Sequence, residues 1–436
     1  MVCRQIASRP GYRRGMVAIM AAVCFTVLLA AAALALDGGA LLTERRHAQE
    51  TADAAALAAA DDLFLNYPAN NGVDSGGTAA SSAQTVATAN GFSNDGTTSS
   101  VTVNIPPAGG NFTDSKKYPG YVEVILTYQV SRSPIGSIFG SGTIPVTARA
   151  VARGLWVPAK PQIIAFDLRS NPPPYGGGLG IGHSSGTIQV LGGPVDVNSS
   201  SAAAASDTSP ASQMTAPAFN ITGNYQGNFA TSNGGSPTTG TRPVPDPLSY
   251  LPAPGGLSAQ SNPGTISSGE VTLQPGSYSG SLVINGTATV HLQSGIYAIQ
   301  GGNFVFTSTG TLDTVGGGVM IYVNPALTFA TLPSINISAT GSNPVILKPL
   351  TSGPYQGITI FQDQSAQPKV VLTGNGFYNI TGTIYASNDI IQVTSSNDPS
   401  MGSQYMGRVI QLAGTSDWTI TQLPQPSHTR LIGLVE

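Results

Sequence analysis

The chain has 436 residues and a formal net charge of −3, and only 9% of its residues are charged. Soluble domains contain about 25% charged residues, so this composition is unusual. Because the chain has no basic cluster beyond a few arginines near its start, nucleic-acid binding is excluded. The many Gly, Thr, Val and Ile residues, with few Lys and Glu, favour β-structure in most of the chain.

An apolar run from Met16 to Leu36, MVAIMAAVCFTVLLAAAALAL, predicts a transmembrane helix. At a rise of about 1.5 Å per residue, it reaches the roughly 30 Å thickness of a bilayer core. The excess of arginine before the run places residues 1–15 in the cytoplasm and the bulk of the chain outside. We therefore expect a single-pass membrane protein with a cytoplasmic N-terminus. The arginines are Arg4, Arg9, Arg13 and Arg14.

A cleaved signal peptide is the alternative interpretation of this run. Ala33-Leu34-Ala35 offers a small-residue cleavage site, but the run is longer than the 7–15 residues that are usual for a signal peptide. The cysteines are Cys3 before the run and Cys24 within it. The exported part therefore has no intrachain disulfide, and extensive burial or repetitive hydrogen bonding must stabilise it.

A second helix is predicted directly after the membrane run, over residues 37–66. Asp37-Gly38-Gly39 predicts a break at the membrane surface, and the following segment is rich in Ala, Leu, Glu, Arg and Gln without Gly or Pro. Its small apolar residues recur every three or four positions, which suits close packing against another helix or a sheet. They are Leu41, Ala48, Ala52, Ala55, Ala59 and Leu63.

Residues 13–62 resemble the N-terminal region of TadG-like proteins of Flp pilus assembly (tight adherence). The matching motifs are RRGMVAIMA from Arg13, LDGG from Leu36, TERRHAQ from Thr43 and TADAAALAAA from Thr51. The resemblance implies an envelope-anchored bacterial protein whose partners are Flp/Tad pilus-assembly components. Processed prepilins carry a glutamate five residues after the cleavage-site glycine, but Met20 stands at that distance from Gly15. Cleavage by a prepilin peptidase is therefore not expected.

Residues 67–155 are predicted to form a small α+β domain. A short helix is expected at Ala79–Asn90, and alternating patterns predict strands at Ser100–Ile105, Tyr121–Val130 and Thr143–Ala152. A long helix followed by a few antiparallel strands is similar to pilins and pseudopilins. The segment after Phe139 also resembles the equivalent stretch of TadG-like and TadE-like proteins.

Residues 156–436 carry an internal repeat. LQPGSY from Leu273 recurs as LQSGIY 19 residues later, and short β-branched strands ending in an aromatic residue begin at Gly318, Gly357 and Gly382. A period of about 20–25 residues indicates a solenoid. The predicted fold class is mainly β, with a C-terminal right-handed parallel β-helix; a two-sheet β-sandwich is the alternative. Ile284, Ile299, Ile321 and Ile360 are expected to be buried. TadG-like proteins look loosely similar through this part.

No compact catalytic constellation is recognised in the sequence. The four histidines have no metal-ligand spacing, although His183 and His291 would meet in some solenoids. Two carboxylates on neighbouring coils would suit polysaccharide cleavage, but acids are sparse, and Asp363 is expected to cap a turn. We therefore predict no catalytic residue, cofactor site or metal site. The acids of the last third are Asp363, Asp389, Asp398 and Asp417.

Tyrosines of the repeats have two interpretations: glycan-stacking residues on an exposed face, or core residues, which we favour. They are Tyr278, Tyr297, Tyr322, Tyr355, Tyr378 and Tyr385. The sequence thus predicts a non-enzymatic, membrane-anchored envelope protein associated with Flp/Tad-type pilus assembly or adherence. The alternative is a surface-tethered β-helix that binds or cleaves polysaccharide. A clustered acidic or arginine-rich patch on one face of the solenoid would favour the alternative.

Overall fold

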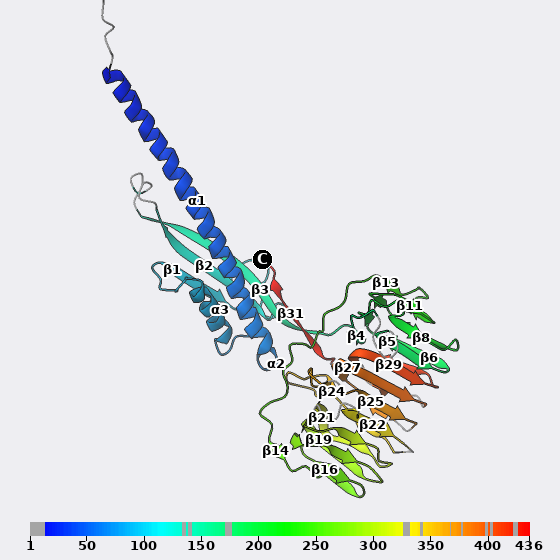
Figure 1. The fold of residues 1–436 in the computed structure, drawn as a ribbon. Helices are drawn as coiled ribbons and strands as arrows, with labels where there is room; N and C mark the ends of the chain where they lie inside the picture. The colour runs from blue at the N-terminus through cyan, green and yellow to red at the C-terminus, as the bar shows by residue number, and fades with distance from the viewer. Residues whose placement is uncertain are drawn as a thin grey trace, which may run out of the picture. The chain divides into compact units, whose positions relative to one another are not determined.

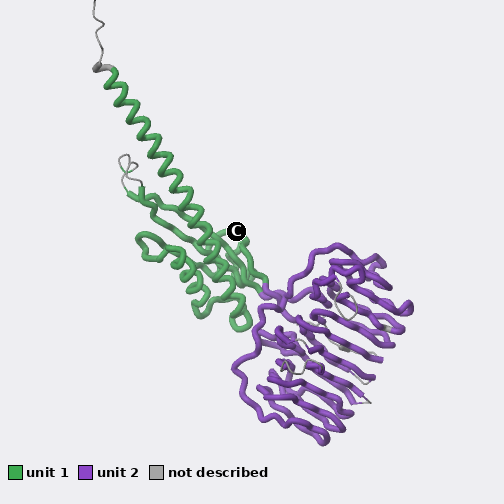
Figure 2. Tube along the Cα trace, viewed as in Figure 1, with its two compact units in different colours: residues 1–155, 431–436 green, residues 156–430 purple. Residues whose placement is uncertain are grey.

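The computed structural model describes residues 14–132, 137, 142–170, 177–325, 332–340, 343–366, 368–375, 378–396, 400–401, 404–421 and 426–436. Cys3, Arg4, Arg9, Arg13, Phe139 and Asp398 lie outside these residues. The fold is mainly β, with a long apolar helix near the N-terminus. The chain divides into two compact units, residues 1–155 with 431–436 and residues 156–430 (Figure 2).

Helix α1 (Arg14–Leu65) is continuous over 52 residues (Figure 1). The predicted break at Asp37-Gly38-Gly39 is therefore wrong. Two glycines cost about 2 kcal/mol relative to alanine, but strong helix formers flank them on both sides, and extending an existing helix is far easier than starting a new one. Among the described residues, α1 alone is long and apolar enough to cross a membrane. Its apolar side chains from Val17 to Leu36 are mostly exposed.

The second half of α1 lies on the core of the first unit, against α3 (Thr78–Ala89) and β2. The predicted alanine stripe is confirmed: Ala48, Ala52, Ala55 and Ala59 are fully buried. Small side chains allow the backbones to approach closely. The predicted short helix and three strands are also confirmed. The remaining elements are α2 (Tyr67–Asn70), β1 (Ser99–Asn104), β2 (Tyr121–Ser131), β3 (Thr143–Pro158) and β31 (His428–Leu434).

The sheet of this unit has the strand order β1-β2-β3-β31. β1–β2 and β2–β3 are antiparallel, with Val124 opposite both Val103 and Ala150. The last strand was not foreseen, because the sequence analysis assigned all of residues 156–436 to one domain. Residues 431–436 instead belong to the first unit, where Val151 exchanges backbone hydrogen bonds with Val435 and Glu436.

Three glycines bring backbones into contact within the first unit. Gly120 N–H donates to Gly72 O at 3.0 Å, and Gly154 N–H donates to Gly120 O at 2.8 Å. A Cβ atom on Gly154 would lie 1.7 Å from the carbonyl oxygen of Ala60 in α1. Glycine is thus required at this position for the backbone of β3 to contact that of α1 at Ala60.

The second unit consists of short strands that pair in parallel along three ladders (Figure 1). The first ladder runs β14 (Ala259–Gln260), β17 (Gly276–Ser279), β19 (Thr289–Gln300), β21 (Leu312–Asn324), β24 (Ile358–Gln362), β27 (Thr383–Ser395), β29 (Gln404–Gly414), β4 (Ile163–Ala165), β7 (Val195–Val197), β10 (Phe219–Ile221) and β13 (Thr238–Thr239).

Two of the long strands, β27 and β29, also contribute to a second ladder. It runs β15 (Thr265–Ile266), β18 (Leu282–Ile284), β20 (Phe304–Phe306), β22 (Ile335–Ala339), β25 (Val370–Gly374), β27, β29, β5 (Leu179–His183), β8 (Ala205–Asp207) and β11 (Tyr225–Gln226).

The third ladder has two stretches. One runs β16 (Glu270–Leu273), β19, β21, β23 (Val345–Leu347), β26 (Tyr378–Ile380) and β28 (Ser400–Met401), and the other runs β30 (Trp418–Thr421), β6 (Gly186–Leu191), β9 (Ser212–Ala216) and β12 (Phe229–Thr231).

The order of strands along the ladders differs from their order in the chain. The chain starts in the middle with β4 and continues through β7 and β10 to β13 at one end. Residues 240–258 connect that end to β14 at the other end (Figure 1). The later strands then return until β29 pairs with β4, with Tyr405 opposite Ile163. We call the pairing of β29 with β4 and β5 the seam.

The recurring strands that begin at Gly318, Gly357 and Gly382 predict the register of the first ladder correctly. Ile321, Ile360 and Ile384 are aligned, and so are Tyr322, Phe361 and Tyr385 one position later. The repeat of LQPGSY as LQSGIY predicts the register correctly in its first half only. Leu273 pairs with Leu292, but Tyr278 pairs with Ile299 rather than with Tyr297. The four isoleucines that were expected to be buried are fully buried.

The first ladder is apolar on both faces. Ile321, Ile360 and Ile384 belong to the main core, whereas Tyr322, Phe361 and Tyr385 form a separate outer cluster. We call residues 244–257 the strap, because they cover this outer cluster with buried leucines. The strap is held by hydrogen bonds from Tyr385 Oη to Asp246 Oδ2 (2.6 Å) and from Tyr355 Oη to the Pro252 carbonyl (2.9 Å). The leucines are Leu248 and Leu251.

Candidate functional site: a charge cluster at the seam

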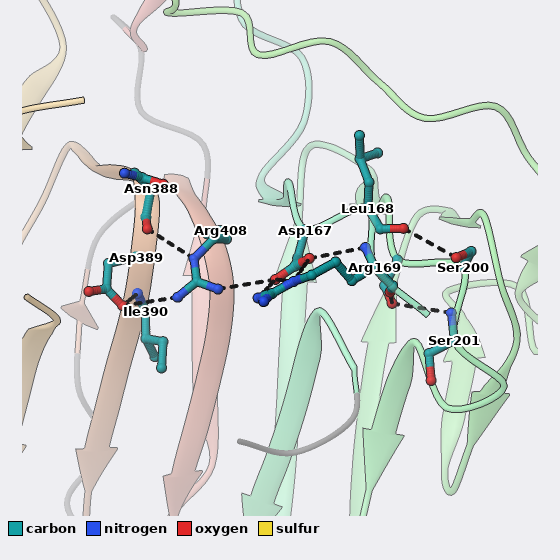
Figure 3. Close-up of polar contacts among 10 residues, drawn as sticks. Asp167, Leu168, Arg169, Ser200, Ser201, Asn388, Asp389, Ile390 and Arg408 are labelled. Atoms are coloured by element: carbon teal, nitrogen blue, oxygen red, sulfur yellow. Dashed lines mark hydrogen bonds and ion pairs between the residues drawn. The ribbon is translucent and has the colours of Figure 1, made fainter. Parts of the chain in front are cut away.

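Four charged side chains meet where the first strands of the second unit pair with its last ones. They are Asp167, Arg169, Asp389 and Arg408, which we call the seam cluster (Figure 3). In a chain with only 9% charged residues, four of them in mutual contact are a distinctive feature.

An irregularity of the first ladder positions the cluster. Ala386 pairs with Gly407, whereas Ile390 pairs with Val409, so β27 has two more residues than β29 between these pairs. Such a bulge redirects side chains. Here it brings Asn388 and Asp389 toward Arg408, the residue between Gly407 and Val409. Asp167 lies two residues after the end of β4, and its N–H donates to the Arg408 carbonyl at 3.0 Å.

Arg408 joins the two sides of the seam. Its Nη1 lies 3.3 Å from Asp167 Oδ2 and its Nη2 lies 3.4 Å from Asp389 Oδ1, while Nε donates to the Asn388 carbonyl at 2.9 Å. Arg169 contacts Asp167 through Nε at 2.9 Å and through its own backbone N–H at 3.0 Å. The side chains of Asp167 and Asp389 are only 3% and 8% exposed, so their carboxylates have lost most of their hydration. The ion pairs with Arg169 and Arg408 compensate for this loss.

The two carboxylates differ in their electrostatics. Burial raises the pKa of Asp167, but the hydrogen bonds and positive charges of Arg169 and Arg408 outweigh it and lower this pKa overall. Burial raises the pKa of Asp389 overall, although the Ile390 N–H and Arg408 oppose it. The charges of two Asp and two Arg cancel. The cluster is therefore neither the acidic nor the arginine-rich patch expected of a polysaccharide-cleaving face.

The sequence analysis considered Asp389 but missed Asp167, Arg169 and Arg408. Asp363 caps a turn as predicted, accepting the Ser365 N–H at 2.9 Å. Asp417 accepts the Thr187 N–H at 2.7 Å on another ladder. The signal in the sequence for the missed residues is a charge shortly after a buried strand, for Asp167 and Arg169, or within one, for Arg408.

The histidines do not come together in the structure. The backbone of His183 pairs with Gly414, whereas His291 pairs with Asp313. His428 stacks on Trp156, with ring centres 4.8 Å apart. Among the residues that the structure describes, no group of three or more His, Cys, Asp or Glu is arranged to hold a metal ion.

The repeat tyrosines are core residues, as favoured by the sequence analysis. All six are at most 6% exposed, and each makes a hydrogen bond through its hydroxyl group, chiefly to backbone carbonyls or carboxylates. They are therefore not available to stack on a glycan.

We predict that His291 makes the stability of the second unit pH-dependent. Its Nδ1 lies 2.6 Å from Asp313 Oδ1 and its Nε2 lies 3.0 Å from Glu270 Oε1. The hydrogen bond to Asp313 raises the pKa of His291; partial burial opposes this, and Glu270 adds to it. The stabilisation is fully present below the unfolded-state pKa of about 6.5. It is lost as pH rises through the higher folded-state pKa.

Chemical unfolding of the wild type and of His291→Gln at a series of pH values tests this. The difference in unfolding free energy between them should shrink as pH rises above about 6.5. Asp313→Asn, which removes the main cause of the shift, should flatten this dependence. A difference that grows with pH would contradict the assignment.

Residues 15–62 match the model of the TadE/G-like Flp pilus-assembly family. The match bears out the resemblance seen in the sequence, and it covers the apolar part of α1 and most of the alanine stripe. It associates this segment with Flp pilus assembly in general. No curated protein and no solved structure matches the chain.

Proposed function

We propose that this chain is a non-enzymatic, membrane-anchored envelope protein that supports Flp/Tad-type pilus assembly or surface adherence. The family match over residues 15–62 carries the proposal. The apolar, largely exposed first part of α1 supports membrane anchoring. The arginines before it favour a cytoplasmic N-terminus and an extracytoplasmic bulk.

We further propose that residues 156–430 form a right-handed parallel β-helix. Three parallel ladders with aligned isoleucines support this more than the two-sheet sandwich, which is typically antiparallel. A repetitive scaffold of this kind is stable without disulfides and with few charges. It would present long, uniform faces to Flp/Tad components or to surface carbohydrate.

Deletion of the gene tests the proposed role. Piliation and attachment to a surface should both fall, and the wild-type gene should restore them. Asp389→Asn should restore them as well, because the seam cluster is not expected to do chemistry. Normal piliation and attachment in the deletion strain would refute the pilus role. Protease added to the outer face should digest residues 156–430, and full protection of that region would reverse the proposed orientation.

A polysaccharide-cleaving enzyme is the second candidate function. One observation favours it: the seam cluster holds one carboxylate with a raised pKa, Asp389, and one with a lowered pKa, Asp167. Such a divergence is typical of acid and base pairs. However, both carboxylates are buried and paired with arginine. Depolymerisation of an acidic polysaccharide by the purified protein, abolished by Asp389→Asn, would establish the enzyme and overturn the non-enzymatic proposal.

A further inference from the structure

A groove of about 180 Å³ opens on the second ladder at the seam, where β27, β29, β5 and β8 lie side by side (Figure 1). A site needs about 10–15 Å³ of such space to hold one water, so the groove has room for several waters or for one sugar ring. Its outward-facing lining residues include Gly180, Gly182, Ser206, Thr208, Gln392 and Gln411.

Two glycines create this groove. Gly180 and Gly182 alternate with Leu179 and Ile181, which belong to the buried core. A Cβ atom on Gly180 would lie 4.0 Å from Gln411 Cγ, and one on Gly182 would lie 3.5 Å from Ala413 Cβ. Both are ordinary contact distances, and neither glycine has a positive φ. Neither packing nor backbone conformation therefore requires glycine here; what the glycines provide is open space.

Gln411 lines the groove, and its side-chain amide is an unpaired hydrogen-bond donor among the described residues. The residue is 9% exposed, and its Nε2 has no hydrogen-bond partner among the described residues. An unpartnered buried donor costs about 1–3 kcal/mol. The Nε2 atom is itself buried, so a turn of the Gln411 side chain toward the groove would bring it to an acceptor oxygen of a ligand there and remove that cost.

The polar groups follow the stacking direction of the strands. Gln392 pairs with Gln411, Gln411 with Gly180, and Gly180 with Ser206. Neighbouring strands are about 4.8 Å apart, so Gln411 and Ser206 lie on opposite sides of the gap at Gly180, two strand spacings or about 10 Å from each other. None of the described residues that line the groove is charged, which favours a neutral ligand.

We propose that this groove binds a neutral glycan, with one sugar ring over Gly180 and Gly182 and its hydroxyls bonded to the Gln411 carboxamide. An extended peptide is disfavoured, because Gln411 is already in parallel pairing on both sides and the groove offers no free strand edge. This binding role goes beyond the proposed part in pilus assembly and does not depend on it.

Calorimetric titration of the full chain in detergent micelles tests the proposal, with cellotetraose, chitotetraose and maltotetraose as probes. At least one probe should bind. Gly180→Val, which fills the groove with a strand-favouring side chain, should weaken that binding at least tenfold. Gln411→Leu should weaken it as much without lowering the unfolding midpoint, because it removes an unpaired donor. Gln213→Leu, an exposed glutamine on β9 of the third ladder, should leave binding unchanged.

Failure of all three probes to bind at millimolar concentration would overturn the proposal. Equal binding by Gly180→Val, Gln411→Leu and the wild type would also overturn it, because the sugar would then sit elsewhere. Loss of pilus function in the deletion strain bears only on the proposed function. The two proposals therefore fail separately.

Discussion

Replacing Gly154 by alanine is expected to destabilise the first unit by about 3 kcal/mol or more. The added methyl group would overlap the Ala60 carbonyl oxygen in α1, at 1.7 Å. That atom belongs to the backbone of a buried helical turn, so no rotamer change relieves the overlap. Either α1 must move off β3, or β3 must bend and lose the hydrogen bond from Gly154 N–H to Gly120 O.

Hydrogen exchange measures this directly. Amides of residues 48–63 should exchange much faster in Gly154→Ala than in the wild type, because the helix loses its contact surface. Gly433→Ala is the matched control, since a Cβ at that position in β31 has no neighbour within 4 Å. Equal protection of the helix in both variants would show that α1 does not lie on β3 as described.

Replacing Phe361 by alanine should destabilise the second unit by about 3–5 kcal/mol. Phe361 is 1% exposed, and its ring lies 5.6 Å from that of Tyr322 and 5.1 Å from that of Tyr385. The variant would leave a cavity beneath the strap and remove both ring contacts. Chemical unfolding of the full chain, followed by tyrosine and tryptophan fluorescence, provides the measurement.

Phe361→Leu is the graded control, because it keeps most of the buried volume and should cost less than half as much. Phe361→Ala should also expose the strap to limited proteolysis, since Leu248 and Leu251 pack in the same cluster. A loss of stability below about 1 kcal/mol would mean that the strap does not cover the outer face of β24.

Local patterns predicted much of the fold. The alanine spacing on α1 and the aromatic-ended strands both reflect repeated contacts with one kind of neighbour, so they are visible in the sequence. The uninterrupted helix through Gly38 and Gly39 was missed because a local propensity was given more weight than helix cooperativity. The pairing of β29 with β4 was missed because solenoid repeats suggest that neighbours in sequence are neighbours in space.

The functional features were harder to predict, because they depend on residues that only the seam brings together. Asp167 and Arg408 lie far apart in the sequence, and Arg408 is an isolated charge there. Gly180 and Gly182 resemble many other glycines of this chain. Their significance emerges only when Gln411 is placed beside them.

The C-terminal strand β31 completes the sheet of the first unit, and this pairing has a consequence for the order in which the protein folds. β31 is part of the first unit's sheet, yet residues 159–427 separate it from β3 in the order of synthesis. The sheet of the first unit therefore cannot be completed until all of the second unit has been translated. A chain that is stalled or clipped before β31 would carry a first-unit sheet in which the edge of β3 is left unpaired, and such an edge is open to pairing with other chains.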